Sequence, residues 1–151
     1  MSKPIRIEGI PQVLVNNQKI LSAVKARTQQ ILAKAALDTE ERAKERVPVA
    51  FGRLKTSIHT EQSGPFTVDV VAEEEYATPV EFGASAHFPP LDPLKLWAQR
   101  VIGDEDAAYP IARKIAAHGT EEQPYMRPSF EEVAPAARSE LDKLARGVSG
   151  K

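Results

Sequence analysis

The chain has 151 residues, no cysteine, a hydrophobic fraction of 42 % and a net charge of -1. This length corresponds to one domain with a core of its own, and the missing cysteines exclude disulfides and thiolate metal sites. The chain lacks the run of about 18 apolar residues that a membrane span needs, and it lacks the basic face typical of nucleic-acid binders.

The charge is unevenly spread along the chain. Residues 1–50 contain nine Lys or Arg and five Asp or Glu, whereas residues 51–151 contain eleven and sixteen. This asymmetry is compatible with head-to-tail contacts between copies. It is equally compatible with a helix whose basic face is simply solvated.

A long amphipathic helix is predicted in the N-terminal third. Apolar residues recur at helical spacing from Ile20 to Val47, so we expect a helix that begins between Pro11 and Asn17 and ends at Pro48. Its length of about 30 residues, or roughly 45 Å, equals that of a whole domain of this size. The helix should therefore bend, or its ends should need a partner. The residues before it, about 1–15, are predicted to form an arm or a short strand.

The pattern changes to alternation after Gly52. Apolar and polar residues alternate over 56–60 and 66–70, and the turn signal Ser63-Gly64-Pro65 lies between them, which predicts a β-hairpin. The segment from Tyr76 to Phe82 is predicted as a third strand with both aromatic rings in the core. Because it contains a proline, we place this strand at the edge of the sheet.

Helices return in the C-terminal half. Residues of about 84–123 are predicted to form a helical excursion with two short helices, one starting at Asp92 and one covering about 106–118. The last helix is expected to begin at Ser129, which forms a capping-box pattern with Glu132. The predicted fold is thus α+β: a long N-terminal helix packed on a small antiparallel sheet of about three or four strands, two short helices and a C-terminal helix, all within one domain, residues 1–151.

Catalytic and metal-binding patterns are missing from the sequence. His59, His87 and His118 are isolated from one another, and no nucleophile elbow, phosphate loop or dinucleotide fingerprint is present. We expect no enzyme activity, no metal and no cofactor. A small enzyme with a site built from scattered residues remains the alternative, and it predicts a deep polar pocket with perturbed titratable groups.

Two charged residues stand out from an otherwise structural pattern. Glu81 lies between two apolar residues, and Arg127 lies between a methionine and a proline. We interpret them as an ion pair, Glu81 with Arg127 or with Arg53, that ties the sheet to the last helix. A contact between subunits is the alternative interpretation.

Three separated segments resemble a known family. They are Pro48 to Ile58, which reads Pro-x-x-x-Gly-x-Leu-x-x-Ser-Ile; Tyr76 to Gly83, which reads Tyr-Ala-x-x-Val-Glu-Phe-Gly; and Pro124 to Pro128, which reads Pro-aromatic-x-Arg-Pro. In this order after a long helix, from about residue 5 to 146, the chain is similar to neck or tail-completion proteins of long-tailed bacteriophages and prophages, such as the lambda tail-completion protein. Phe51 departs from the small polar residue that the family usually has before the glycine.

The resemblance implies a structural role in the virion. It implies a ring at the head–tail junction, assembled in the host bacterial cytoplasm from an expected six or twelve copies. Its partners would be further copies and the tail-terminator, head-closure or portal-adaptor proteins, with genomic DNA only passing through and no membrane contact. Alternatives are a tail-terminator or head-closure protein of the same junction, or a component of a prophage-derived particle. The residues that the resemblance marks as motif or interface positions are Gly52, Arg53, Leu54, Tyr76, Glu81, Phe82, Gly83, Trp97, Arg127 and Pro128.

Overall fold

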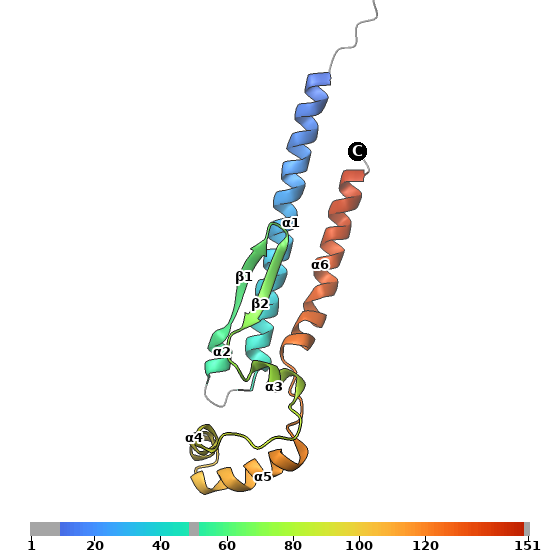
Figure 1. Cartoon of the computed structure of the whole chain (residues 1–151). Coiled ribbons are helices and arrows are strands. Elements are labelled where there is room, and N and C mark those ends of the chain that lie inside the picture. The colour runs from blue at the N-terminus through green and yellow to red at the C-terminus, as the bar shows by residue number, and fades with distance from the viewer. Residues whose placement is uncertain (1–9, 49–51, 150–151) are drawn as a thin grey trace, which may run out of the picture.

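The fold is an elongated α+β structure built along two long antiparallel helices (Figure 1). The computed structural model describes residues 10–48 and 52–149. In chain order the elements are α1 (Ile10–Arg46), α2 (Arg53–Ser57), β1 (Ile58–Gly64), β2 (Thr67–Ala72), α3 (Ala77–Phe82), α4 (Leu91–Val101), the 3-10 turn η1 (Glu105–Ala107), α5 (Ala108–His118) and α6 (Met126–Ser149).

The predicted N-terminal helix is confirmed as α1, which has 37 residues. Its buried stripe follows helical spacing and consists of Ile31, Ala36, Thr39, Ala43 and Val47. The last backbone bond of this stripe runs from the Val47 N–H to the Ala43 carbonyl, just before Pro48. Because α1 already begins at Ile10, part of the predicted arm is helical. The remainder of the arm, residues 1–9, lies outside the described residues.

The predicted hairpin is confirmed as β1 and β2, which pair in antiparallel register from Ile58 with Ala72 to Gly64 with Thr67. It packs along α1, and two side-chain hydrogen bonds join them. The Thr60 hydroxyl donates to the Glu40 carboxylate at 2.5 Å, and the Gln29 amide donates to the Pro65 carbonyl at 3.0 Å. The sheet of the described residues has two strands rather than three or four.

The predicted third strand is wrong, because residues 77–82 form the short helix α3. Ala77 and Glu81 are buried and Val80 packs against the core, which is i, i+3, i+4 spacing on one helix face. Tyr76 and Phe82 are instead 40 % and 62 % exposed, so the prediction that both are core residues is also wrong. Six residues are too few for the sequence to distinguish this spacing from strand alternation.

A second, smaller difference precedes the hairpin. Residues 53–57 form the helical turn α2, so the strand begins at Ile58, and not at Thr56 as predicted. The hydroxyls of Thr56 and Ser57 donate to the carbonyls of Arg53 and Leu54, three residues earlier. Such local bonds favour a turn over an extended strand.

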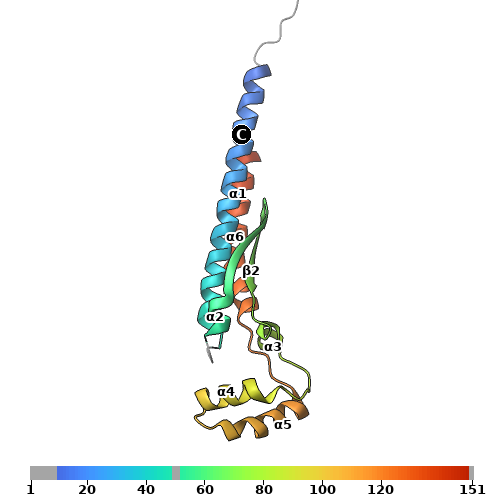
Figure 2. The same cartoon turned by 60° about the vertical axis from the view of Figure 1, so that its left-hand side comes forward.

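The predicted helical excursion forms a separate two-helix unit at one end of the molecule (Figure 2). Helices α4 and α5 pack on each other and on η1, through the buried residues Ala98, Ala108 and Ala112. Helix α4 begins at Leu91, slightly before the predicted Asp92. Gly119 ends α5 with a φ of 73°, as its predicted position after the helix requires.

Helix α6 runs back along α1 and is fastened to it by charged side chains (Figure 2). Glu132 pairs with Arg42 at 2.5 Å and with Arg46, and Arg27 lies 3.8 Å from Glu140. The helix begins at Met126, three residues before the predicted Ser129. Among the described residues, no helix has the length and apolar character that a membrane crossing needs.

Candidate functional site

The three sequence segments that resemble the phage family meet in one hydrophobic cluster. Leu54 from the first segment, Ala77 from the second and Tyr125 from the third are all buried there. The cluster is completed by Ala43 and Val47 at the end of α1, together with Ile58, which begins the hairpin. We call this region, where α1, α2, α3 and the start of α6 converge, the motif junction. It brings residues that are far apart in sequence into one contact.

The centre of the motif junction is the carboxylate of Glu81, whose residue is only 5 % exposed. One oxygen, Oε2, accepts hydrogen bonds from the backbone N–H groups of Tyr125 at 2.7 Å and Met126 at 2.8 Å. The other oxygen, Oε1, accepts from the backbone N–H of Arg127 at 2.9 Å. The donors are Tyr125, which immediately precedes α6, and Met126 and Arg127, the first two residues of α6.

This arrangement accounts for every free donor at the N-terminus of α6. The first four N–H groups of an α-helix have no partner within the helix. Here three of them, from Tyr125 to Arg127, donate to Glu81, and the fourth position is Pro128, which has no N–H to satisfy. The positive end of the helix dipole also favours a carboxylate at this place. Glu81 is therefore a cap supplied by α3, 44 residues before the helix that it caps.

The predicted ion pair of Glu81 is corrected by this geometry. Glu81 does tie its segment to the last helix, but the donor is the backbone of residue 127 and its neighbours instead of a guanidinium. The side chain of Arg127 lies 3.5 Å from Glu122, and that of Arg53 lies 3.4 Å from Glu74. A carboxylate that already accepts three short hydrogen bonds has its charge compensated without a cation.

The base of the helical excursion is closed beside the same cap. Ala84 and Thr120 exchange two backbone hydrogen bonds, of 3.1 and 2.9 Å, and the Gln123 N–H donates to the Val80 carbonyl at 2.8 Å. Gly83 makes this approach possible. Its φ is 73°, and a Cβ there would lie 2.6 Å from the Thr120 carbonyl oxygen. Gly83 thus follows a helix and not the predicted strand, and both its positive φ and the close approach require glycine.

Gly52 also has a positive φ but lies in a less crowded place than Gly83. It has a φ of 74° at the start of α2, as expected for a tight turn, but a Cβ there would meet no described atom within 4 Å. Leu54, two residues later, is buried as predicted. Only conformation, and not space, therefore demands glycine at position 52.

Tyr125 connects the cap to the helix pair. Its side chain is buried, and burial together with the nearby Glu81 charge raises the pKa of its phenol. Its carbonyl accepts a 2.5 Å hydrogen bond from the Ser129 hydroxyl, which in turn accepts from Arg46 of α1 at 3.0 Å. The predicted capping-box role of Ser129 and Glu132 is thus wrong. Ser129 lies within the helix, and Glu132 pairs across to α1.

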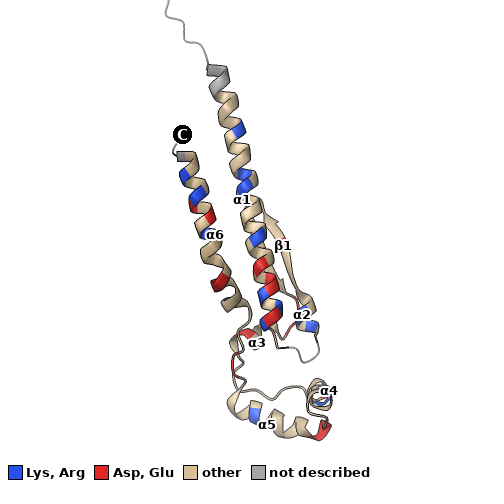
Figure 3. Ribbon diagram, turned by 180° about the vertical axis from the view of Figure 1, so that it is seen from behind, with Lys and Arg blue, Asp and Glu red and all other residues tan. Residues whose placement is uncertain are grey.

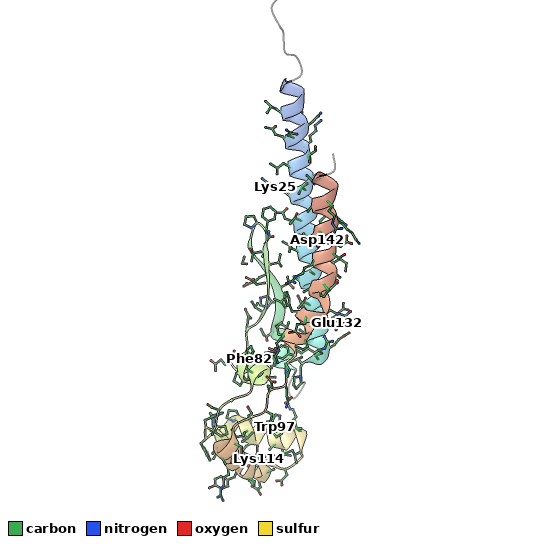
Figure 4. The ribbon with its side chains drawn as sticks, turned by 90° about the vertical axis from the view of Figure 1, so that its right-hand side faces the viewer. Lys25, Phe82, Trp97, Lys114, Glu132 and Asp142 are labelled. Carbon is green, nitrogen blue, oxygen red and sulfur yellow. The ribbon has the colours of Figure 1, made fainter. Side chains whose placement is uncertain are left out.

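The remaining motif positions lie on the surface and are not brought together. Phe82 and Tyr76 expose their rings at the two ends of α3, and Figure 4 shows Phe82 on α3 and Trp97 in the two-helix excursion. Trp97 is half-buried in α4. These exposed side chains are available for contact with another molecule, whereas Glu81 and Leu54 are not.

Two hollows on the surface of the described residues are lined by residues outside the three motifs. A groove of about 620 Å³ runs along α6 from Phe130 to Arg146, and a second of about 150 Å³ lies between α1 and the hairpin. None of the motif residues lines either hollow. In the described part of the chain, no three His, Asp or Glu side chains are placed to hold a metal ion.

The donors of the cap were missed by the sequence analysis, because backbone N–H groups carry no side-chain signature. One signal was available. Proline is favoured in the first turn of a helix, so Pro128 indicated a start before residue 128 and not at Ser129. A helix that starts there needs a cap, and Glu81 was the unexplained carboxylate.

Comparison with known proteins gives one family. Residues 14–83 match the model of the family described as "Bacteriophage HK97-gp10, putative tail-component". This segment extends from α1 to Gly83 and includes the first two sequence motifs together with Glu81. The chain matches none of the curated proteins and none of the solved structures with which it was compared.

Proposed function

We propose that this chain is a structural protein of the phage neck, because residues 14–83 match the model of a family described as a putative phage tail component. In this proposal, copies assemble as a ring at the head–tail junction, complete the tail and join it to the head. Genomic DNA passes through the ring, and the ring contacts tail-terminator, head-closure or portal-adaptor proteins. Assembly takes place in the cytoplasm of the host bacterium.

The observation that carries the proposal is the use made of the motif residues. Glu81 caps a helix through three backbone hydrogen bonds, and Leu54 and Tyr125 form the core around it. These positions build a rigid junction instead of a substrate site. A function by assembly needs this rigidity, together with surfaces that remain free for partners.

A second observation supports assembly. The first part of α1 and the two-helix excursion both project from the body, and both expose large apolar side chains (Figure 1). Exposed apolar surface at the ends of a long molecule is typical of a protein that is buried by its neighbours. The alternative of a tail-terminator or head-closure protein uses the same features in a different layer of the junction.

Deletion of the gene from the phage or prophage genome that carries it tests the proposal. Negative-stain electron microscopy of the induced lysate should show filled heads and separate tails, and the wild-type gene on a plasmid should restore joined particles. Normal, infectious particles from the deletion strain would refute the neck role. Joined particles with tails of irregular length would favour the tail-terminator alternative.

A further inference from the structure

Two apolar surfaces at opposite ends of the molecule have no partner among the described residues of the chain. The first, which we call the α1 end, is residues 14–25 of α1, where Leu14, Ile20 and Leu21 are exposed. The second, which we call the α4–α5 turn, is residues 101–106, from the end of α4 to the start of α5, where Val101 and Ile102 are each 51 % exposed. Figure 1 shows them at the two extremes of the structure, so one copy cannot cover the first with the second.

The α1 end continues the face by which α1 contacts the rest of the molecule. Leu14 and Leu21 lie two and one heptads before Thr28, which is half-buried, and residues seven apart share a helix face. The buried stripe begins only at Ile31. The same apolar face therefore extends beyond the elements that cover it, and a further helix can pack there in the same manner.

The two surfaces have opposite charge. Residues 10–37 contain Lys19, Lys25, Arg27 and Lys34 and no acidic residue. Arg27 and Lys34 are near Glu140 and Asp38, whereas Lys19 and Lys25 have no ion-pair partner among the described residues. The α4–α5 turn carries the acidic run Asp104-Glu105-Asp106, which Gly103 separates from its apolar pair. Figure 3 shows basic residues on this part of α1 and acidic residues at the turn between α4 and α5.

The two-helix excursion is also a unit that a third helix would complete. Helices α4 and α5 have 11 residues each, and their fully buried contacts are made by alanines. Units of fewer than about 40 residues rarely hold a core alone. The exposed stretch of the α1 end, residues 14–23, has nearly the same length as these helices.

We propose that the α1 end of one copy packs against the α4–α5 turn of the next copy. The inference rests on the proposed function, because it names the contact through which copies associate. Apolar side chains meet apolar side chains, and Lys25, which lies on the same helix face as Leu21, faces Glu105 and Asp106. A contact between two α1 ends would bring like charges together. The contact uses two different surfaces, so it is heterologous, and it generates a ring when the rotation between copies closes.

Cysteine cross-linking tests this contact directly, because the natural chain contains no cysteine. We would prepare Leu21→Cys, Ile102→Cys and, as a matched control, Leu37→Cys. Leu37 lies on the same helix and is 58 % exposed, compared with 54 % for Leu21, but it is on another face. In each pair, one purified variant carries a C-terminal tag that changes its mass, so homodimers and heterodimers separate on a gel. The two variants are mixed at equal concentration, oxidised, and analysed on non-reducing gels by mass.

The proposal predicts that the 21–102 disulfide dimer forms about tenfold more than the 37–102 dimer, as expected for an orientation preference of about 1.4 kcal/mol. The charge reversal Lys25→Glu should remove this excess, and adding Glu105→Lys with Asp106→Lys should restore it. Lys19→Glu, on the opposite face of the helix, should leave the excess unchanged. Equal yields of 21–102 and 37–102, or an excess of 21–21, would overturn the proposal. Loss of DNA-duplex binding on reversal of the two lysines, without any 21–102 excess, would assign the basic end to nucleic acid instead. Microscopy of particles tests the neck role separately, so a neck without this link would refute only the contact.

Discussion

Replacing Glu81 tests the physical core of the structure, because a single buried carboxylate holds the start of α6. In Glu81→Ala, the N–H groups of Tyr125, Met126 and Arg127 lose their acceptor. A hydrogen bond to a charged group contributes about 1.5–3 kcal/mol. Three such bonds at the lower value give about 4.5 kcal/mol, and relief of the carboxylate's desolvation returns about 1–2 kcal/mol. We expect Glu81→Ala to lower the free energy of unfolding by about 3 kcal/mol.

Glu81→Gln separates charge from shape. The amide keeps one acceptor oxygen but presents an N–H₂ group where a second acceptor is needed, so we expect a loss of about 1–3 kcal/mol. Urea denaturation followed by circular dichroism measures both variants. A loss of 3 kcal/mol corresponds to a fall in Tm of about 6–12 °C for a domain of this length.

Arg127→Ala is the matched control for the cap. It removes the guanidinium that the sequence suggested as the partner of Glu81, but it keeps the backbone N–H that the structure identifies as the donor. Its side chain is half-exposed and reaches only Glu122, at 3.5 Å. We therefore expect Arg127→Ala to change the free energy of unfolding by at most about 0.5–1 kcal/mol. If Arg127→Ala were as destabilising as Glu81→Gln, or if Glu81→Ala were neutral, the capping account would be refuted.

Three further predictions concern glycine geometry and charge. Gly83→Ala should lower the free energy of unfolding by about 3 kcal/mol or more, because its Cβ would lie 2.6 Å from a backbone oxygen. Gly52→Ala has a similar φ but no described atom within 4 Å of its Cβ, so it should lower the free energy of unfolding by about 1–2 kcal/mol. Equal losses in urea denaturation would contradict this contrast. Hydrogen bonds from Lys44 and Thr60 lower the pKa of Glu40 in the folded state. The stability that ionised Glu40 contributes is therefore present above its unfolded pKa of about 4.3 and is lost as pH falls through the folded pKa. Glu40→Gln should flatten the decline in Tm between about pH 5 and 3, and an unchanged decline would count against this role of Glu40. A hydrogen bond from Arg46 likewise lowers the pKa of Glu132. Glu132→Gln should lower Tm at low ionic strength but much less in about 1 M salt, because salt screens the ion pair. A salt-independent difference in Tm would mean that the ion pair is not the cause of the stabilisation.

Elements with a long periodic pattern were predictable from the sequence. The stripe of α1 spans many turns, and the hairpin is marked by a turn signal between two alternating runs, so both were recognised with their approximate bounds. The two short helices of the excursion were found from proline, glycine and their apolar faces. In each case local physics and the final fold agree.

The short elements were not predictable, because tertiary contacts decide them. Residues 76–82 satisfy strand alternation and helical spacing equally well, and the helix prevails since it turns Glu81 inward onto α6 while the ring of Phe82 faces solvent. The cap itself depends on backbone donors 44 residues away from the carboxylate. A sequence can show that a buried glutamate needs a partner, but only the fold identifies a partner without a side chain.

The central claim, that this chain functions in the phage neck, is tested most directly by locating it in assembled particles. A small affinity tag on the C-terminus, complementing a deletion of the gene, can be labelled with gold and imaged on purified virions by electron microscopy. The account predicts gold at the junction between head and tail on particles that remain infectious. Gold along the tail tube or at its distal tip, with none at the junction, would contradict it.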